Sequence, residues 1–401
     1  MAVIRPFRAV RPNRENAAAV SSVPYDVVST DEARAMASGN PLSFLHVTRS
    51  EIDLPPGTDP YSPQVYAKAR ENFQKLRDAA PLVTEDAPSL YFYRLRMGGH
   101  EQTGIAACFS LDEYGHDQIK KHERTRPDKE DDRTRHMIAL GAQSGVVFLT
   151  YPADPAVDRL AWAVTADAPL YDFRADDGVH HTVWRVGQRE AAALVDAFAR
   201  IPALYIADGH HRAASAARAS AEVNSPESHT FIAVAFPDTQ VNILPYNRVV
   251  RDLAGQTPEA FLAALGARLP VREGRATPRG KGEVSMFLGG TWYAIDLSAA
   301  PSADLSRAQS LDVARLEHHV LGPLLKVGDI RTDRRIDFVG GARGTAALEN
   351  AVTSGQGAVA FSMYPVTIED LMSIADEGGI MPPKSTWFEP KLRDGLLVHV
   401  I

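Results

Sequence analysis

The sequence is poor in cysteine and has no long apolar run. Cys108 is the one cysteine among 401 residues, so the chain cannot form an internal disulfide. Its apolar surroundings predict a buried thiol. No stretch contains the roughly 20 apolar residues that span a bilayer, and the first residues lack the apolar segment of a signal peptide. We therefore expect a cytoplasmic protein without membrane contact.

An excess of positive charge is also missing. The formal net charge is −7, from 43 Lys and Arg and 50 Asp and Glu residues. This balance and the absence of a helix-turn-helix pattern argue against nucleic acid as a partner. The chain is 45% hydrophobic and 23% charged, as in globular proteins, and its length predicts two domains.

Apolar periodicity predicts both strands and helices. Strands are expected at 89–97, 104–111, 145–151 and 230–236, and helices at 66–79 and 188–198. Gly98-Gly99 and Asp176-Asp177-Gly178 predict the turns of two hairpins. The fold class is therefore mixed α+β. We expect a first domain at 1–240, and a C-terminal α/β domain at 241–401 that packs against it.

The pentapeptide Asp208-Gly209-His210-His211-Arg212 is the most informative motif. It follows the apolar run 204–207 and precedes the alanine-rich run 213–218, which predicts a strand, a tight turn and a helix N-terminus. Free N–H groups at a helix start, with a guanidinium and two imidazoles beside them, favour a phosphate or another oxyanion. The alternative is a simple N-cap with solvated histidines, which leaves His-His-Arg unexplained.

A second cluster, residues 120–133, mixes cations, carboxylates and a histidine with almost no apolar residue. A solvated helix face is an equally good interpretation. In the functional interpretation, Glu123 is a general base or a metal ligand, while Lys121, Lys129 and Arg133 hold a polyphosphate. Phosphoryl transfer needs such a mixture because its catalysis is mostly positioning and charge neutralisation.

Two further stretches could contact phosphate. Residues 336–344 form a strand followed by a glycine-rich turn, which matches no known phosphate fingerprint and favours a plain turn. In the stretch 381–391, two prolines stiffen the chain before Lys384, Ser385 and Thr386, although Trp387 and Phe388 could equally pin this segment to a core. The pairs His180-His181 and His318-His319 lack a third zinc ligand, and Asp26 is typical of a turn.

The Asp-Gly-His-His-Arg turn, with its flanking strand and helix, resembles the ParB/sulfiredoxin-like superfamily. His210 stands where sulfiredoxins need a reactive cysteine, and the motif is most similar to that of the free serine kinases. Over nearly its whole length the chain also resembles the DUF1015 family. The matching marks are Arg5-Pro6-Phe7, Pro24-Tyr25-Asp26-Val27-Val28, His122-Glu123-Arg124-Thr125, the Asp208 motif, Phe338-Val339-Gly340-Gly341 and Met381-Pro382-Pro383-Lys384-Ser385-Thr386.

The resemblance implies a ParB/sulfiredoxin-like phosphotransferase core with insertions. It implies a kinase that uses ATP or ADP with Mg²⁺ and phosphorylates serine or a similar small substrate. Glu123 with His122 would act as the base, and Asp208 would hold Mg²⁺ or orient the acceptor. The phosphate ligands would be Gly209, His210, His211, Arg212, Lys129, Arg133, Lys384, Ser385 and Thr386.

Two other functions fit the same residues. One is a phosphatase of a phosphoserine-like molecule, which would release inorganic phosphate without a nucleotide. The other is a non-catalytic, nucleotide-binding switch protein in the manner of ParB. The oligomeric state is open, with a homodimer as one alternative.

Overall fold

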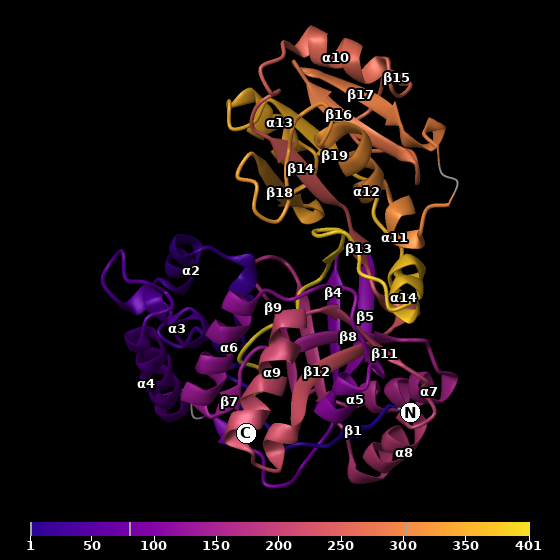
Figure 1. The fold of residues 1–401 in the computed structure, drawn as a ribbon. Coiled ribbons are helices and arrows are strands. Elements are labelled where there is room, and N and C mark those ends of the chain that lie inside the picture. The colour runs from indigo at the N-terminus through magenta and orange to yellow at the C-terminus, as the bar shows by residue number, and fades with distance from the viewer. Residues whose placement is uncertain (1, 80–81, 302–303) are drawn as a thin grey trace. The chain divides into compact units, whose positions relative to one another are not determined.

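The computed structural model describes residues 2–79, 82–301 and 304–401. It divides into two compact units (Figure 1). Unit 1 comprises Met1–Val241 and Pro390–Ile401, and unit 2 comprises Asn242–Glu389. The sequence predicts one break near residue 240, whereas the structure returns the last segment of the chain to unit 1.

Unit 1 is built around a sheet of nine strands, counted over the described residues. Its order is β6-β11-β8-β12-β5-β4-β10-β9, and β1 pairs with β5. The pairs β11–β6 and β12–β8 are parallel, and the other neighbours are antiparallel. The bounds are β1 Ile4–Arg5, β4 Tyr91–Met97, β5 His100–Ser110, β6 Ile119–Lys120, β8 Val147–Tyr151, β9 Tyr171–Arg174, β10 His180–Arg185, β11 Leu204–Asp208 and β12 Thr230–Pro237.

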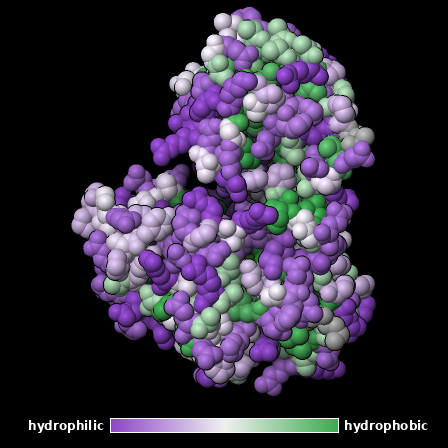
Figure 2. Space-filling model, in the orientation of Figure 1, coloured by the Kyte–Doolittle hydropathy of each residue, from purple (hydrophilic) through white to green (hydrophobic). Residues whose placement is uncertain are grey.

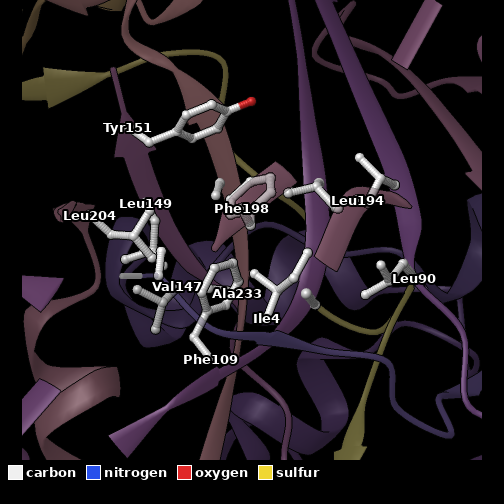
Figure 3. Packing of buried hydrophobic residues seen from close by; sticks show 14 of the residues in the cluster. Ile4, Leu90, Phe109, Val147, Leu149, Tyr151, Leu194, Phe198, Leu204 and Ala233 are labelled. Carbon is white, nitrogen blue, oxygen red and sulfur yellow. The ribbon is translucent and has the colours of Figure 1, made fainter. Parts of the chain in front are cut away.

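The core of unit 1 follows from the alternation along these strands. Val147 and Leu149 of β8, Phe109 of β5 and Ala233 of β12 point to one side, where they meet Phe198 of helix α8 (Gln188–Phe198) (Figure 3). All five residues are at most 2% exposed. Burying each large side chain contributes roughly 1.5–3 kcal/mol. The β4–β5 hairpin, with Gly98 at a φ of 60°, confirms the first predicted turn.

The helices of unit 1 begin and end at ordinary signals. Ser29 forms a capping box with Glu32 at the start of α2, and Gly141 closes α6 with a φ of 61°. Helix α9 packs alongside α6 (Figure 1). The bounds are α1 Ala17–Val20, α2 Thr30–Ala37, α3 Leu45–Thr48, α4 Pro63–Ala79, α5 Leu111–Gly115, α6 Pro127–Leu140, α7 Pro155–Thr165 and α9 His210–Val223.

The last segment of the chain is held in unit 1 by backbone pairing. Strand β21 (His399–Val400) pairs with β7 (Ala142–Gln143), and Val398 bridges Val10 of β2 (Val10–Arg11), which itself pairs with β3 (Val83–Thr84). Asp394 forms a further bridge with Ser22. These contacts bring residues 391–394 next to the start of α9.

Unit 2 has its own sheet, in the order β15-β17-β16-β19-β14-β18, and its own core around Phe287 and Leu348. Every pair in this sheet is antiparallel, so the unit is of the α+β type. The bounds are β13 Ile243–Leu244, β14 Tyr246–Val250, α10 Pro258–Gly266, β15 Val271–Glu273, β16 Glu283–Leu288, β17 Thr291–Asp296, α11 Arg307–Ser310, α12 Asp312–Leu316, β18 Ile336–Gly340, α13 Ala346–Thr353, β19 Val359–Ser362, α14 Ile368–Asp376 and β20 Trp387–Phe388.

Hydrophilic residues dominate the face shown in Figure 2, and apolar residues form only small patches there. Among the helices of the described ranges, none combines the length and apolar composition that crossing a membrane requires.

Candidate functional site

The Asp208 motif forms the predicted junction of strand, turn and helix. The pairing of β11 with β8 shifts between Ile206 and Asp208, so the strand becomes irregular where the motif starts. Gly209 follows with a φ of 100°, and a Cβ there would lie 3.0 Å from Nε of Arg212. Only glycine fits this turn without strain.

Helix α9 begins directly after the glycine. Within the residues that the structure describes, no side chain caps its N-terminus. The first N–H groups of the helix therefore keep their capacity to bind an anion, and the helix dipole adds a partial positive charge there.

Arg212 is the central cation of the site. Its side chain is 4% exposed, and Nη1 donates to the carbonyl of Val146. Over the described part of the chain, Nε and Nη2 have no hydrogen-bond partner. The nearest carboxylate oxygens, from Asp208 and Asp26, lie 3.5 and 3.6 Å from Nη2, too far for good hydrogen bonds. Burial alone would lower the pKa of Arg212, but these carboxylates outweigh burial and raise it, so the group stays charged.

Asp208 is paired with a lysine from the far end of the sequence. Nζ of Lys391 donates to Oδ2 of Asp208 over 3.0 Å. Burial by itself would raise the pKa of Asp208, but Lys391 and Arg212 together hold it well below its usual range. The carboxylate is therefore ionised at any physiological pH.

The two histidines of the motif bind the protein backbone. Nε2 of His210 accepts from the N–H of His122 over 3.3 Å, and Nε2 of His211 accepts from the N–H of Arg126 over 3.0 Å. Since each Nε2 is an acceptor, the ring proton of each neutral imidazole sits on Nδ1. Burial lowers the pKa of both residues. The histidines therefore hold the segment 122–126 against α9 and add no positive charge for a phosphate.

Glu123 lies beside the motif, as the sequence predicts for a base near this turn. Its Oε2 is 3.8 Å from Nδ1 of His210, and its side chain is 46% exposed. His122 packs edge-on against His210, with ring centroids 4.4 Å apart, and burial lowers its pKa to about 4. Of Glu123 and His122, it is therefore Glu123 that offers an accessible acid–base group. His122 is neutral and supports the site by packing against His210.

The structure adds site residues that carry little signal in the sequence. Asp26 reaches Arg212 with a side chain that is 37% exposed, although its local sequence is typical of a turn. Asp394 is 1% exposed and its Oδ2 has no partner; burial raises its pKa to about 7, against the opposing effect of Arg212. Lys391 and Asp394 lie in a short charged run. The local sequence does not mark them as site residues, and their importance is seen from a long-range contact.

Lys129 and Arg133 of α6 make contacts with side chains outside the motif. Nζ of Lys129 contacts the hydroxyl of Tyr61 at 2.5 Å. Arg133 pairs with Asp132 at 2.7 Å and lies 4.2 Å above the ring of Tyr25. Arg133 therefore supports the loop that carries Asp26, and its predicted phosphate contact stays a prediction.

The remaining predicted residues, Lys384, Ser385 and Thr386, belong to unit 2. Lys384 is exposed, Thr386 is half-buried, and the hydroxyl of the buried Ser385 donates to the carbonyl of Pro382 over 2.5 Å. Among the paired histidines, His181 is buried between Tyr93 and Arg393, at 2.8 and 3.2 Å, which supports its structural interpretation. Arg393 also pairs with Asp177, so this chain of contacts anchors the segment that carries Lys391.

A resident Mg²⁺ at Asp208 is not supported by the ligands present. Over the described residues, no group of three or more His, Cys, Asp or Glu side chains could hold a metal ion. The Asp208 carboxylate is already flanked by Lys391 and Arg212.

These features define a mixed α+β protein whose main polar cluster lies at a junction of strand, turn and helix. The chain belongs to the DUF1015 family of proteins of unknown function, whose pattern matches residues 4–314. No protein of curated function matches the chain in sequence.

Several solved structures are similar to the chain at low identity. SbnI with a C-terminal truncation, from Staphylococcus aureus, is 14% identical with a TM-score of 0.40, over 74% of this chain and 87% of that one. A conserved hypothetical protein from Pyrococcus furiosus gives 15% and 0.37, over 74% and 95%. A free serine kinase in complex with AMP gives 12% and 0.36, over 73% and 91%. These similarities are weak, so the functional proposal rests on the site itself.

Proposed function

We propose that this protein is a phosphotransferase that moves the terminal phosphoryl group of ATP or ADP to the hydroxyl of a small metabolite, with free serine as the first acceptor to test. The observation that carries the proposal is Arg212. Its Nε and Nη2 are buried donors without hydrogen-bond partners, next to an uncapped helix start. Such donors are costly to leave unpaired, and phosphate oxygens satisfy them with charge-assisted bonds.

The reaction follows from the groups around this turn. The acceptor hydroxyl oxygen attacks the terminal phosphorus, a new P–O bond forms, and the bond to the bridging oxygen breaks. The leaving nucleotide keeps that electron pair, and Glu123 takes the hydroxyl proton. Arg212 and the N–H groups of α9 stabilise the charge on the transferring phosphoryl oxygens.

Acidic residues around Arg212 have a separate task in this proposal. Asp208 and Asp26 hold the guanidinium between them at 3.5 and 3.6 Å. Lys391 neutralises Asp208. Without that lysine, the carboxylate would repel an incoming phosphate at short range.

The test is turnover with defined variants. Wild-type protein is incubated with ATP or ADP, Mg²⁺ and a panel of amino acids and sugars, and phosphorylated products are followed by mass spectrometry. We expect phosphoserine together with the shortened nucleotide. Glu123→Gln should lower kcat by about 10²–10⁴-fold, the usual contribution of a general base. Glu222→Gln, an exposed glutamate at the other end of α9, is the matched control and should leave kcat unchanged.

Other outcomes separate the alternatives. Absence of turnover with every acceptor, together with absence of nucleotide binding, would overturn the kinase proposal. Release of inorganic phosphate from phosphoserine without a nucleotide would identify a phosphatase. Nucleotide binding without any turnover would favour a switch protein.

A further inference from the structure

Two sequence motifs of unit 2 meet on one surface. Strands β14 and β18 pair so that Tyr246 lies opposite Gly340 and Arg248 opposite Phe338. The indole of Trp387 packs on Gly340, because a Cβ there would lie 2.6 Å from Cε2 of the tryptophan. Gly340 therefore allows the indole to pack closely against the backbone. This packing brings the stretch 381–391 onto the stretch 336–344.

Three aromatic side chains make up the apolar part of this surface. The ring of Tyr246 stands edge-on to Phe338 at 5.8 Å and to Trp387 at 5.0 Å. All three residues are half-buried. Partly exposed aromatic rings in a fixed arrangement offer faces on which a planar group can stack.

A lysine is held beside these rings by a strained backbone. Lys384 has a φ of 58°, a conformation that side chains other than glycine rarely adopt. Nη2 of the buried Arg248 donates to its carbonyl over 3.1 Å, which fixes the turn. The result is that Nζ of Lys384 lies 5.4 Å from the centroid of the Tyr246 ring. Strain of this kind persists where the surrounding structure enforces it, and it is common at ligand sites.

A second cation lies at the glycine-rich turn. Arg343 is exposed and ends the short 3-10 helix Gly341–Arg343, directly after β18. Arg248 adds a third positive charge below the surface, with its guanidinium carbon 5.6 Å from the centroid of Phe338. Burial lowers the pKa of Arg248 to about 10, so it is still protonated at neutral pH. The surface thus combines aromatic rings with positive charge.

We propose that this aromatic and cationic surface of unit 2, formed by Tyr246, Phe338, Trp387 and Lys384, with Arg343 at the end of the adjoining turn, binds a nucleoside phosphate. The base would stack on the aromatic rings, and the phosphates would meet Lys384 and Arg343. Two exposed cations match the few charges of a mononucleotide, and the overall charge of −7 disfavours a long polyanion. The inference deepens the proposed function. It rests on that function because ATP and ADP are chosen as ligands from it.

Calorimetric titration of the full chain with ATP and with ADP tests the inference. We expect Lys384→Met and Tyr246→Leu each to raise Kd at least tenfold. Lys326→Met is the matched control, because Lys326 is also an exposed lysine of unit 2 with a positive φ, of 55°, and it should leave Kd unchanged. Thermal unfolding of each variant confirms that unit 2 is folded, and Lys384→Met changes only an exposed side chain.

The outcomes distinguish this inference from the proposed function. Unchanged Kd values for both Lys384→Met and Tyr246→Leu overturn the inference, even if phosphoryl transfer is observed. Tighter binding of a single-stranded oligonucleotide than of ATP also overturns it. If the wild-type chain binds ATP in a manner that depends on Lys384 but transfers no phosphoryl group, the inference stands and the proposed function fails.

Discussion

At the scale of single residues, the charges at the Asp208 motif are closely balanced. Arg212 and Lys391 supply two positive charges, and Asp208, Asp26 and Asp394 face them. Binding a phosphate adds negative charge, so one of these carboxylates has to be compensated or neutral. Asp394 is suited to this because burial raises its pKa to about 7.

Asp394 should make stability depend on pH in a defined direction. Its pKa in the folded state lies above the unfolded value of about 3.9, so the folded protein binds the proton more tightly between these values. Stability is therefore lost as pH rises through this window. The neutral variant Asp394→Asn avoids that loss. We compare the change in free energy of unfolding, measured with guanidinium chloride, when the pH is raised from 5 to 8. Relative to wild type, this change should be more favourable to the folded state by about 3 kcal/mol in Asp394→Asn.

Asp31→Asn is the control for the loss of one negative charge, because that side chain is 95% exposed. It should change the free energy of unfolding by under about 0.5 kcal/mol at either pH. A constant difference between wild type and Asp394→Asn at the two pH values would contradict the assignment of Asp394 as a buried carboxyl with a raised pKa.

At the scale of elements, the segment 122–126 depends on α9 for its position. The N–H groups of His122 and Arg126 donate hydrogen bonds to the rings of His210 and His211, respectively. His211→Ala should release the Arg126 amide. A typical hydrogen bond contributes about 1 kcal/mol, so hydrogen exchange of this amide should quicken roughly fivefold. Mass spectrometry of the peptide over 120–126 measures the change.

His180→Ala is a suitable control for this measurement. The ring of His180 contacts the side chain of Asp172 at 2.6 Å and no backbone group of the segment 122–126. Exchange of the segment should be the same in this variant as in wild type. Equal exchange in His211→Ala as well would show that other contacts hold the segment.

Elements with local signals could be predicted well from the sequence. Helix α8 has the expected bounds, Gln188–Phe198, because its apolar spacing is regular. The stretch 23–28 contains a short 3-10 helix, Tyr25–Val27, whose Tyr25 contacts Arg133, a residue that is distant in sequence. Residues 312–321 form α12 followed by a wider π-type turn, Glu317–Leu321.

The site could be predicted only in part, for a related reason. Unusual composition marks Glu123 and the Asp208 motif as candidate site residues in the sequence. The structure places them together. The partners of the two histidines are backbone N–H groups, which are the same in every sequence and give no signal. Lys391 is 183 positions from Asp208, and no periodicity connects them.

At the scale of the whole molecule, unit 2 is an insertion within unit 1. The chain enters unit 2 through β13 and leaves it through β20, and Ile243 pairs with Phe388. Paired strands lie about 4.8 Å apart, so the two ends of the insertion are neighbours. Each unit has an apolar cluster of its own, because the one around Phe109 and Phe198 is built from residues of unit 1 and the one around Phe287 from residues of unit 2.

Unit 1 should therefore fold without the insertion. A chain in which a short Gly-Ser linker replaces residues 242–389 should unfold in one cooperative thermal transition, followed by near-ultraviolet circular dichroism. It keeps both the sheet and the pair between Lys391 and Asp208. A gradual transition without a near-ultraviolet signal would show that unit 1 needs unit 2 in order to fold.

The return of the chain to unit 1 also sets an order of events during synthesis. Lys391 leaves the ribosome 183 positions after Asp208. At roughly 5–20 residues per second, this delay is on the order of 10–40 s. During that time the nascent protein can form β11, the turn at Gly209 and α9. Lys391 has not yet been synthesised, so Asp208 lacks its lysine partner. Translation has to pass through the whole of unit 2 before the turn acquires its final set of charges.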